Sequence, residues 1–248
     1  MSAKRLLIDI GNTTLSYCSE TDLEKGQINS VQHGKYDLEM LLNNAAKSEK
    51  IDELLLASVY DAELTNTIQN WCETQGILCK IAQSLPQKHG LKNGYIDPVQ
   101  LGVDRWLSML GIWAEIRSAF FLVTCGTALT FDQVNEHGEH QGGVIIPGFQ
   151  MMQSCLKKGT VGIDNTDKKN DAFWGLAQNT QDAITNGSLM AICSVIENLI
   201  DDAGMDVSQG YISGGDAKLI NAFRQKPLKR IKNAVLTGLS VDNEALPR

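Results

Sequence analysis

Two short stretches of this sequence place a carboxylate beside groups that can hold an anion. In Asp9-Ile10-Gly11-Asn12-Thr13-Thr14, the carboxylate precedes a glycine that permits a tight turn, and amides and hydroxyls suited to phosphate oxygens follow. Leu101-Gly102-Val103-Asp104-Arg105 stands at the predicted start of a long helix, where free backbone amides favour anions. A carboxylate such as Asp9, together with substrate phosphates, is also what Mg²⁺ prefers. These stretches predict a site for a phosphorylated substrate.

Each stretch taken alone has a plainer interpretation. Gly-Asn is common in hairpin turns, and an adjacent Asp-Arg pair is more often a surface feature. A third stretch, Ser213-Gly214-Gly215-Asp216, either lets a flat adenine lie against its backbone or is an ordinary strand-to-helix turn. Together the three favour a phosphotransferase, because each lies at a predicted strand end or helix start.

Several other chemistries lack their motifs. The sequence has no G-x-x-x-x-G-K followed by Ser or Thr, and no two glycines separated by a single residue, which excludes P-loop, Rossmann and protein-kinase glycine loops. It also has no G-x-S-x-G and no H-E-x-x-H. His137 and His140 flank a predicted hairpin turn and are interpreted as solvated turn residues rather than metal ligands.

Composition narrows the partners and the compartment. Lys and Arg number 22 against 29 Asp and Glu, a net charge of −7, which argues against a nucleic-acid or anionic-membrane partner. The six cysteines are too widely spaced for a zinc ribbon or a redox pair, and we expect buried free thiols in a reducing cytosol. Asp9 interrupts the first apolar stretch too early for a signal peptide, and no apolar run approaches the ~18 residues of a membrane span. The expectation is a soluble cytoplasmic protein.

The elements that must position these residues follow from periodicity and turn signals. Strands are predicted over 4–10, 15–19, 27–33, 54–59, 77–82, 119–124, 129–134, 142–146, 209–213 and 231–236. Helices are predicted over 37–47, 61–74, 103–117, 149–157, 180–203 and 216–224, with a short terminal helix. This is an α/β chain.

The second half repeats the element order of the first. The loop at residues 9–13 corresponds to the loop at 124–128, a period of about 115 residues that indicates an internal duplication with halves 1–117 and 118–248. The alternative is that any α/β chain can be cut into similar halves. The polar stretch 164–171 is predicted to be a mobile loop or lid.

In their order and spacing these residues resemble the type III pantothenate kinases, of the superfamily that includes sugar kinases, chaperone ATPases and actin. The resemblance covers most of the chain and rests on five motifs, which begin at Asp9, Asn93, Gly126, Gly142 and Gly214. It implies a duplicated RNase H-like/actin-like fold with the active site in the cleft between two similar halves. It also implies ATP-dependent phosphorylation of pantothenate to 4'-phosphopantothenate, the first step of coenzyme A biosynthesis.

The resemblance also implies residue roles. Asp104 would be the general base, because an alcohol is too weak an acid to ionise freely at neutral pH. ATP would be held by Asp9, Gly11, Asn12, Thr13, Thr14 and Thr127, with Mg²⁺ on Asp9 through water. The pantothenate site would be lined by Tyr95, Gly102, Val103, Asp104, Arg105 and Thr180. Arg105 suits the carboxylate of pantothenate because a guanidinium donates two parallel hydrogen bonds. A homodimer is implied as well.

Two alternatives remain beside pantothenate phosphorylation. One is a kinase of another small hydroxyl compound, and the other is a non-catalytic regulatory protein of the same fold. Only Thr124 favours the regulator. The presence of both Asp9 and Asp104 weighs against it, because a binding module has no need of a base beside an acceptor site.

Thr124 also carries a testable consequence. The family usually has an Asp two residues before the Gly-Thr of the second loop, where it helps bind an activating monovalent cation. A neutral hydroxyl at that position loses most of the electrostatic attraction for K⁺. We therefore predict weak or absent dependence on K⁺ or NH₄⁺, measured as pantothenate-dependent ADP release in Tris buffer with either ion added and choline chloride holding the ionic strength. Steep hyperbolic activation by either ion would contradict this.

Overall fold

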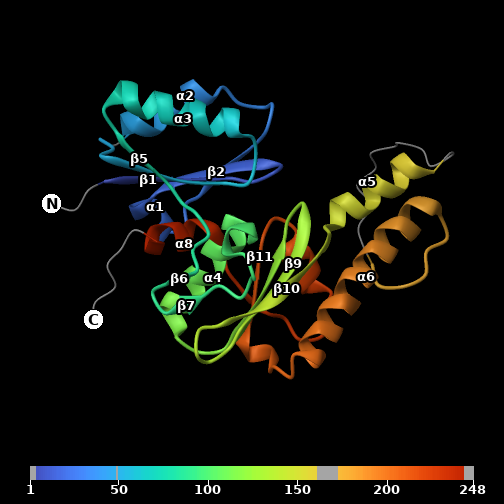
Figure 1. The fold of residues 1–248 in the computed structure, drawn as a ribbon. Helices are drawn as coiled ribbons and strands as arrows, with labels where there is room; N and C mark the ends of the chain where they lie inside the picture. The colour runs from blue at the N-terminus through green and yellow to red at the C-terminus, as the bar shows by residue number, and fades with distance from the viewer. Residues whose placement is uncertain (1–3, 49, 161–172, 243–248) are drawn as a thin grey trace. The chain divides into compact units, whose positions relative to one another are not determined.

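The computed structural model describes residues 4–48, 50–160 and 173–242 and contains two five-stranded sheets of the same order (Figure 1). The predicted lid at 164–171 lies outside the described residues. The first sheet has the order β3-β2-β1-β4-β5, with β1 (Arg5–Ile10), β2 (Thr14–Ser19), β3 (Asn29–Gln32), β4 (Glu53–Ser58) and β5 (Leu78–Ile81). The second has the order β10-β9-β8-β11-β12, with β8 (Phe120–Cys125), β9 (Ala128–Val134), β10 (His140–Pro147), β11 (Gly210–Ser213) and β12 (Lys229–Arg230).

The central strand of each sheet has the same kind of neighbours. β1 pairs antiparallel with β2 and parallel with β4, while β8 pairs antiparallel with β9 and parallel with β11. The loop that leaves β1 and the loop that leaves β8 therefore occupy equivalent places in their sheets. This agreement confirms the α/β class and is the arrangement that a duplication leaves.

The described chain forms two compact units. Unit 1 comprises residues 4–118, 137–140 and 233–242, and unit 2 comprises 119–136, 141–160 and 173–232. The chain returns to unit 1 at its end because α8 (Ala234–Asp242) packs against α4 (Val103–Ile116). The predicted halves 1–117 and 118–248, which a single cut defines, remain a prediction.

In unit 1, helices cover both faces of the sheet. α2 (Leu38–Ser48) and α3 (Ala62–Gln75) lie on one side, and α8 lies on the other (Figure 1). Alternate residues of β1 and β4 enter the core beneath α2 and α3, since successive strand side chains point to opposite faces. These core residues include Leu6, Ile8, Ile10, Leu54 and Leu56. A short helix that the sequence analysis did not predict, α1 (Glu20–Glu24), follows β2.

The predicted strand over 231–236 is wrong. The last strand is the two-residue β12, and α8 begins at Ala234. A short apolar run fits a buried strand and a buried helix equally well, so its composition did not decide between them. Asn233 was the available signal, because its Oδ1 accepts the Leu236 N–H at 3.0 Å in the manner of a helix N-cap.

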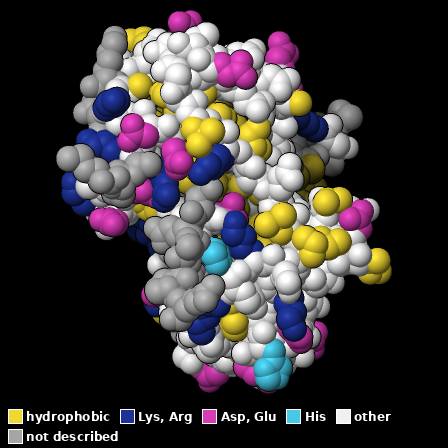
Figure 2. Space-filling view, turned by 60° about the vertical axis from the view of Figure 1, so that its left-hand side comes forward, with side chains coloured by type: hydrophobic (Ala, Val, Ile, Leu, Met, Phe, Trp, Pro, Cys, Tyr) yellow, Lys and Arg dark blue, Asp and Glu magenta, His cyan; other side chains and the backbone are white. Residues whose placement is uncertain are grey.

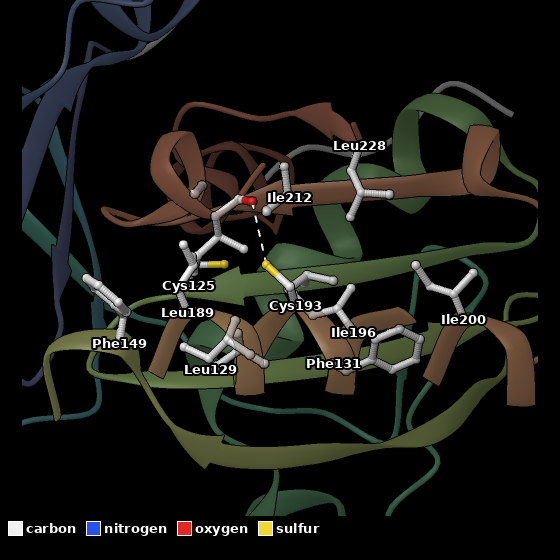
Figure 3. Packing of buried hydrophobic residues seen from close by; sticks show 14 of the residues in the cluster. Cys125, Leu129, Phe131, Phe149, Leu189, Cys193, Ile196, Ile200, Ile212 and Leu228 are labelled. Carbon is white, nitrogen blue, oxygen red and sulfur yellow. Dashed lines mark hydrogen bonds between the residues drawn. The ribbon is translucent and has the colours of Figure 1, made fainter. Parts of the chain in front are cut away.

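In unit 2, one long helix provides most of the core opposite the sheet. α6 (Thr180–Asp202) places Leu189, Cys193, Ile196 and Ile200 against side chains of β8 and β9, as Figure 3 shows, and Ile192 belongs to the same cluster. α7 (Ala217–Ala222) closes the same cluster, and α5 (Phe149–Gly159) contributes Phe149 to it.

α6 is the one helix among the described residues that is long and apolar enough to cross a membrane by length and composition. The sequence analysis, which looked for uninterrupted apolar runs, did not single it out. Half of the relevant stretch is buried inside the structure, as in the core helix of a globular protein.

All six cysteines are free thiols. Four of them are buried, Cys79 is half-buried and Cys155 is exposed, so the expected burial is wrong for Cys155. The exposure of Cys155 follows from its place on α5, of which only Phe149 is fully buried.

The segment between β5 and α4 holds only short elements. β6 (Gln87–Lys88) and β7 (Leu91–Lys92) form a small antiparallel pair, and a 3₁₀ turn, η1 (Pro98–Gln100), precedes α4. A second such turn, η2 (Val207–Gln209), precedes β11 in unit 2.

The close contact of α4 and α8 depends on glycine. A Cβ at Gly238 would overlap the carbonyl oxygen of Leu107, and a Cβ at Gly111 would lie 2.8 Å from the backbone nitrogen of Gly238. Helix α4, whose first turn carries Asp104 and Arg105, is therefore held against α8 by direct backbone contact.

We predict that Gly238→Ala lowers the free energy of unfolding by about 1–3 kcal/mol, because the helices must separate to admit the methyl group. Gly187→Ala is the matched control, since Gly187 is an exposed residue of α6 with nothing within 4 Å of an added Cβ. That control is expected to gain about 0.5–1 kcal/mol from the higher helix propensity of alanine. Urea unfolding measures both, and an equal change in the two variants would contradict the packing account.

Candidate active site

The first loop is a hairpin turn that presents polar residues. The Gly11 N–H donates to the Thr14 carbonyl oxygen at 3.0 Å, which closes the turn between β1 and β2. Asn12 and Thr13 are exposed at its tip. The plainer interpretation of Gly-Asn as a hairpin turn is thus correct, and the turn places polar residues at an exposed tip.

Asp9 lies near the end of β1 in an environment that disfavours its charge. Burial, and to a smaller extent the negative charge of Asp104, raise the pKa of Asp9 to about 7. Asp9 and Asp104, 95 positions apart, therefore lie within electrostatic reach of each other in unit 1. The two stretches singled out by residue type therefore lie near each other in unit 1.

Asp104 is fixed in the first turn of α4. Its Oδ1 accepts the backbone N–H of Arg105 at 2.8 Å, and the helix begins after Gly102. A Cβ at position 102 would lie 2.5 Å from that same Oδ1, so glycine leaves room for the carboxylate. The positive end of the helix dipole favours negative charge at this place.

Arg105 is buried, with 6% of its surface exposed, and it is joined to Tyr95. Its Nη1 donates to the Tyr95 hydroxyl at 2.7 Å, and its guanidinium lies 5.5 Å from the centre of the Tyr95 ring. The Tyr95 ring is also stacked on the His140 ring, with the ring centres 5.9 Å apart and the planes 13° from parallel. The expectation that His140 is a solvated turn residue is wrong, because His140 is 3% exposed and begins β10, whereas His137 is exposed.

The loop that carries Tyr95 is braced by Asn93. The Asn93 side chain donates to the carbonyl oxygens of Leu85 and Pro98 and accepts the Tyr95 N–H at 3.0 Å. A Cβ at Gly94 would overlap the carbonyl oxygen of His140. The Asn-Gly-Tyr sequence therefore serves to set Tyr95 beside Arg105. Sequence reasoning missed the part of His140, for which residue type gave no signal.

Three expected site residues lie in unit 2. Thr127 follows β8 in a loop closed by Gly126 N–H donating to the Ala128 carbonyl at 3.0 Å, as Gly11 closes the first loop. The Thr127 carbonyl accepts the Gly148 N–H at 3.0 Å, and Gly148 is too close to Gly126 for a side chain.

Thr124 and Thr180 occupy different places in unit 2. Thr124 is half-buried on β8, in register with Thr130 of β9 and Ser213 of β11, so three hydroxyl residues form a row across the sheet. Thr180 is exposed at the first position of α6. The structure thus groups Asp9–Thr14, Tyr95 and Gly102–Arg105 in unit 1, groups Thr124 with Thr127 in unit 2, and places Thr180 on a separate element.

The stretch from Ser213 to Asp216 is a turn seated on the end of β8. Gly214 has φ of +100°, and a side chain there would overlap the backbone of Cys125. The Asp216 N–H donates to the Cys125 carbonyl at 3.1 Å. Burial raises the pKa of the Asp216 carboxyl, against the opposing effect of a hydrogen bond with Gln150. An adenine on this backbone stays a prediction.

The described residues contain no cluster of three or more His, Cys, Asp or Glu side chains able to hold a metal ion by themselves. Mg²⁺ commonly uses one or two carboxylates together with substrate phosphates, and Asp9 fits that mode because a nearby cation would relieve the cost of its buried charge.

Comparison with known proteins identifies the family. The family model of type III pantothenate kinase matches residues 5–202. A type III pantothenate kinase of Acinetobacter baumannii is 32% identical over 228 residues, which is 90% of each chain.

Solved structures extend the comparison to the fold. A chain described as a conserved putative Baf family transcriptional activator from Campylobacter jejuni has a TM-score of 0.60 at 21% identity, covering 95% of this chain and 96% of its own. A putative 2-dehydro-3-deoxygalactonokinase from Sinorhizobium meliloti has a TM-score of 0.55 at 12% identity, covering 96% and 97%. At these identities the likeness shows the fold alone, which is the fold shared by sugar kinases and actin-like ATPases.

Proposed function

The chain belongs to the type III pantothenate kinase family and is a kinase that phosphorylates pantothenate in coenzyme A biosynthesis, and we propose which of its residues carry the reaction. The observation that supports the assignment is the electrostatic coupling of Asp9 to Asp104. It indicates that the loop suited to phosphates and the helix start suited to a base lie near each other in unit 1.

We assign the general base to Asp104. In the transfer, the Asp104 carboxylate takes the proton of the primary hydroxyl of pantothenate while the hydroxyl oxygen forms a bond to the γ-phosphorus of ATP. The bond between that phosphorus and the bridging oxygen breaks, and ADP leaves with the electron pair. The hydrogen bond from the Arg105 N–H holds the base in position, and such a base contributes about 10² to 10⁴ in rate.

The β1–β2 loop is assigned to ATP. Asp9, Gly11, Asn12, Thr13 and Thr14 would face the phosphates, with Thr127 of unit 2 as a further contact. Mg²⁺, when bound with ATP, neutralises charge on the transferred phosphoryl group. Asp9 would hold it through water. A raised pKa such as that of Asp9 is expected for a buried carboxylate of a cation site that contains no cation.

The pair of Arg105 and Tyr95 is assigned to the carboxylate end of pantothenate. Arg105 is buried and oriented by its bond to Tyr95, so its guanidinium is already set to donate to an anion. Gly102, Val103 and Thr180 complete the proposed set. Thr124, at the family's cation position, offers a hydroxyl and no charge, which is why K⁺ or NH₄⁺ is given no essential role.

A homodimer is proposed from the apolar surface of unit 2. Apolar side chains gather in patches on the face shown in Figure 2. Those of unit 2 with more than a third of their surface exposed lie on β10, on α5 and before α6, and they are Val144, Ile145, Met151, Leu156, Phe173, Trp174 and Leu176. Burial of such a surface against a second copy is the simplest use for it. We place the enzyme in the cytoplasm, in keeping with its free cysteines, and we propose that residues 1–117 and 118–248 are duplicated halves.

The assignment of the base is tested by Asp104→Asn. Pantothenate-dependent ADP release is expected to fall at least a hundredfold in kcat, with ATP binding retained, because the amide cannot accept the proton. Asp61→Asn is the matched control, since Asp61 is an exposed N-cap of α3 in the same unit and Asn caps a helix equally well. Unchanged turnover of Asp104→Asn would remove Asp104 from the role of base.

A further inference from the structure

His33 contacts the β1–β2 loop at two points. It follows β3, and its backbone N–H donates to the Thr13 carbonyl oxygen at 3.1 Å. Its ring Nε2 lies 2.8 Å from the carbonyl oxygen of Gly11. A carbonyl oxygen has no proton to give, so Nε2 carries the hydrogen and donates it.

The ring of His33 is itself held on two sides. It is stacked on Tyr60 with the ring centres 4.2 Å apart and the planes 9° from parallel. Its Nδ1 lies 3.1 Å from the Tyr36 hydroxyl. Because the neutral ring already has its proton on Nε2, Nδ1 accepts from that hydroxyl. Tyr36 and Tyr60 thus fix the direction of the donor.

The bond to Gly11 orients the next amide of the loop. The C=O and N–H of a trans peptide point in opposite directions, so a Gly11 carbonyl turned toward His33 turns the Asn12 N–H away from it. The Gly11 N–H is already occupied by the Thr14 carbonyl. The Asn12 amide is therefore the group whose direction the His33 ring sets before any ligand arrives.

We propose that His33 is a positioning residue for ATP, which holds the peptide between Gly11 and Asn12 so that its N–H faces the phosphates. His33 touches no reacting atom in this role. The proposal rests on the assignment of the β1–β2 loop to ATP. Its advantage is preorganisation, since a donor that is already aimed costs less ordering on binding.

Two substitutions test the hydrogen-bond donor of His33 and its stacking on Tyr60 separately. His33→Phe keeps an aromatic ring against Tyr60 and removes the donor, whereas His33→Gln keeps an amide donor near the place of Nε2 and removes the ring. One hydrogen bond of this kind is worth a factor of about 3–10 in affinity. We expect His33→Phe to raise KM for Mg-ATP by about that factor and to leave KM for pantothenate within about twofold, and His33→Gln to restore most of the loss.

A matched control removes an equivalent bond elsewhere in unit 1. His89 places its Nε2 3.2 Å from the Val241 carbonyl oxygen, and His89→Asn is too short to reach it. His89 has φ of +50°, which Asn tolerates, so the control adds little backbone strain. KM for Mg-ATP is expected to be unchanged in this variant.

The outcomes distinguish this proposal from the assignment beneath it. Asp9→Asn measured in parallel reports whether the loop binds ATP. If Asp9→Asn weakens ATP binding and His33→Phe does not, the positioning role is wrong and the ATP loop stands; if neither weakens it, both fail. Two results would mean a structural role only and overturn the proposal. One is an equal rise of the KM for Mg-ATP and the KM for pantothenate in His33→Phe. The other is a KM for Mg-ATP that stays normal in His33→Phe but rises in His33→Gln.

A fourth variant covers the case in which His33→Phe does not fold. Tyr36→Phe removes only the hydroxyl that steadies Nδ1, and a smaller rise in KM for Mg-ATP alone is expected. No rise in that variant, with native unfolding behaviour, would contradict the proposal.

Discussion

The proposed site depends on two carboxylates held near each other, one of which, Asp9, lies where burial makes its charge costly. Asp9 is brought there by the central strand of the first sheet and Asp104 by the first turn of α4, and the charge of Asp104 disfavours ionisation of Asp9. A fold selected for stability alone would separate them or replace one. Their proximity is what we expect of the proposed site, in which a cation would relieve the charge of Asp9 and an acceptor hydroxyl would use that of Asp104.

Glycines help to hold the elements around these carboxylates, because they allow one backbone segment to approach another closely. Gly102 leaves space for the carboxylate of Asp104, and Gly238 lets α8 lie directly on the helix that carries it. Gly94 lets the Tyr95 loop reach His140, whose ring backs the tyrosine that orients Arg105. These glycines therefore support the residues that we assign to the acceptor, and His33 contacts the loop that we assign to the phosphates.

Much of this could be predicted from residue type and periodicity, and the failures have physical causes. The strand from Arg5 to Ile10 and helix α4 could be predicted from their sequence patterns. The effect of Asp104 on the pKa of Asp9 indicates that the carboxylates of two motifs lie near each other in unit 1, while the roles of the site residues stay predictions. A short terminal helix was predicted, but the start of α8 was assigned to a strand because a short apolar run has no period of its own. The parts of His140 and His33 depend on ring stacking and on carbonyls that face them from distant segments, which a linear pattern does not contain.

The coupling of the two carboxylates is tested most directly by the titration of Asp9 itself. Carboxyl-carbon NMR of the protein without Mg²⁺ and nucleotide, with Asp9→Asn used to assign the signal, gives the pKa of Asp9 in the wild type and in Asp104→Asn. The account predicts a pKa near 7 in the wild type, and a lower value in the variant that still exceeds the ordinary 3.8 because burial is the larger cause. An ordinary value in the wild type, or a pKa that Asp104→Asn leaves unchanged, would contradict it.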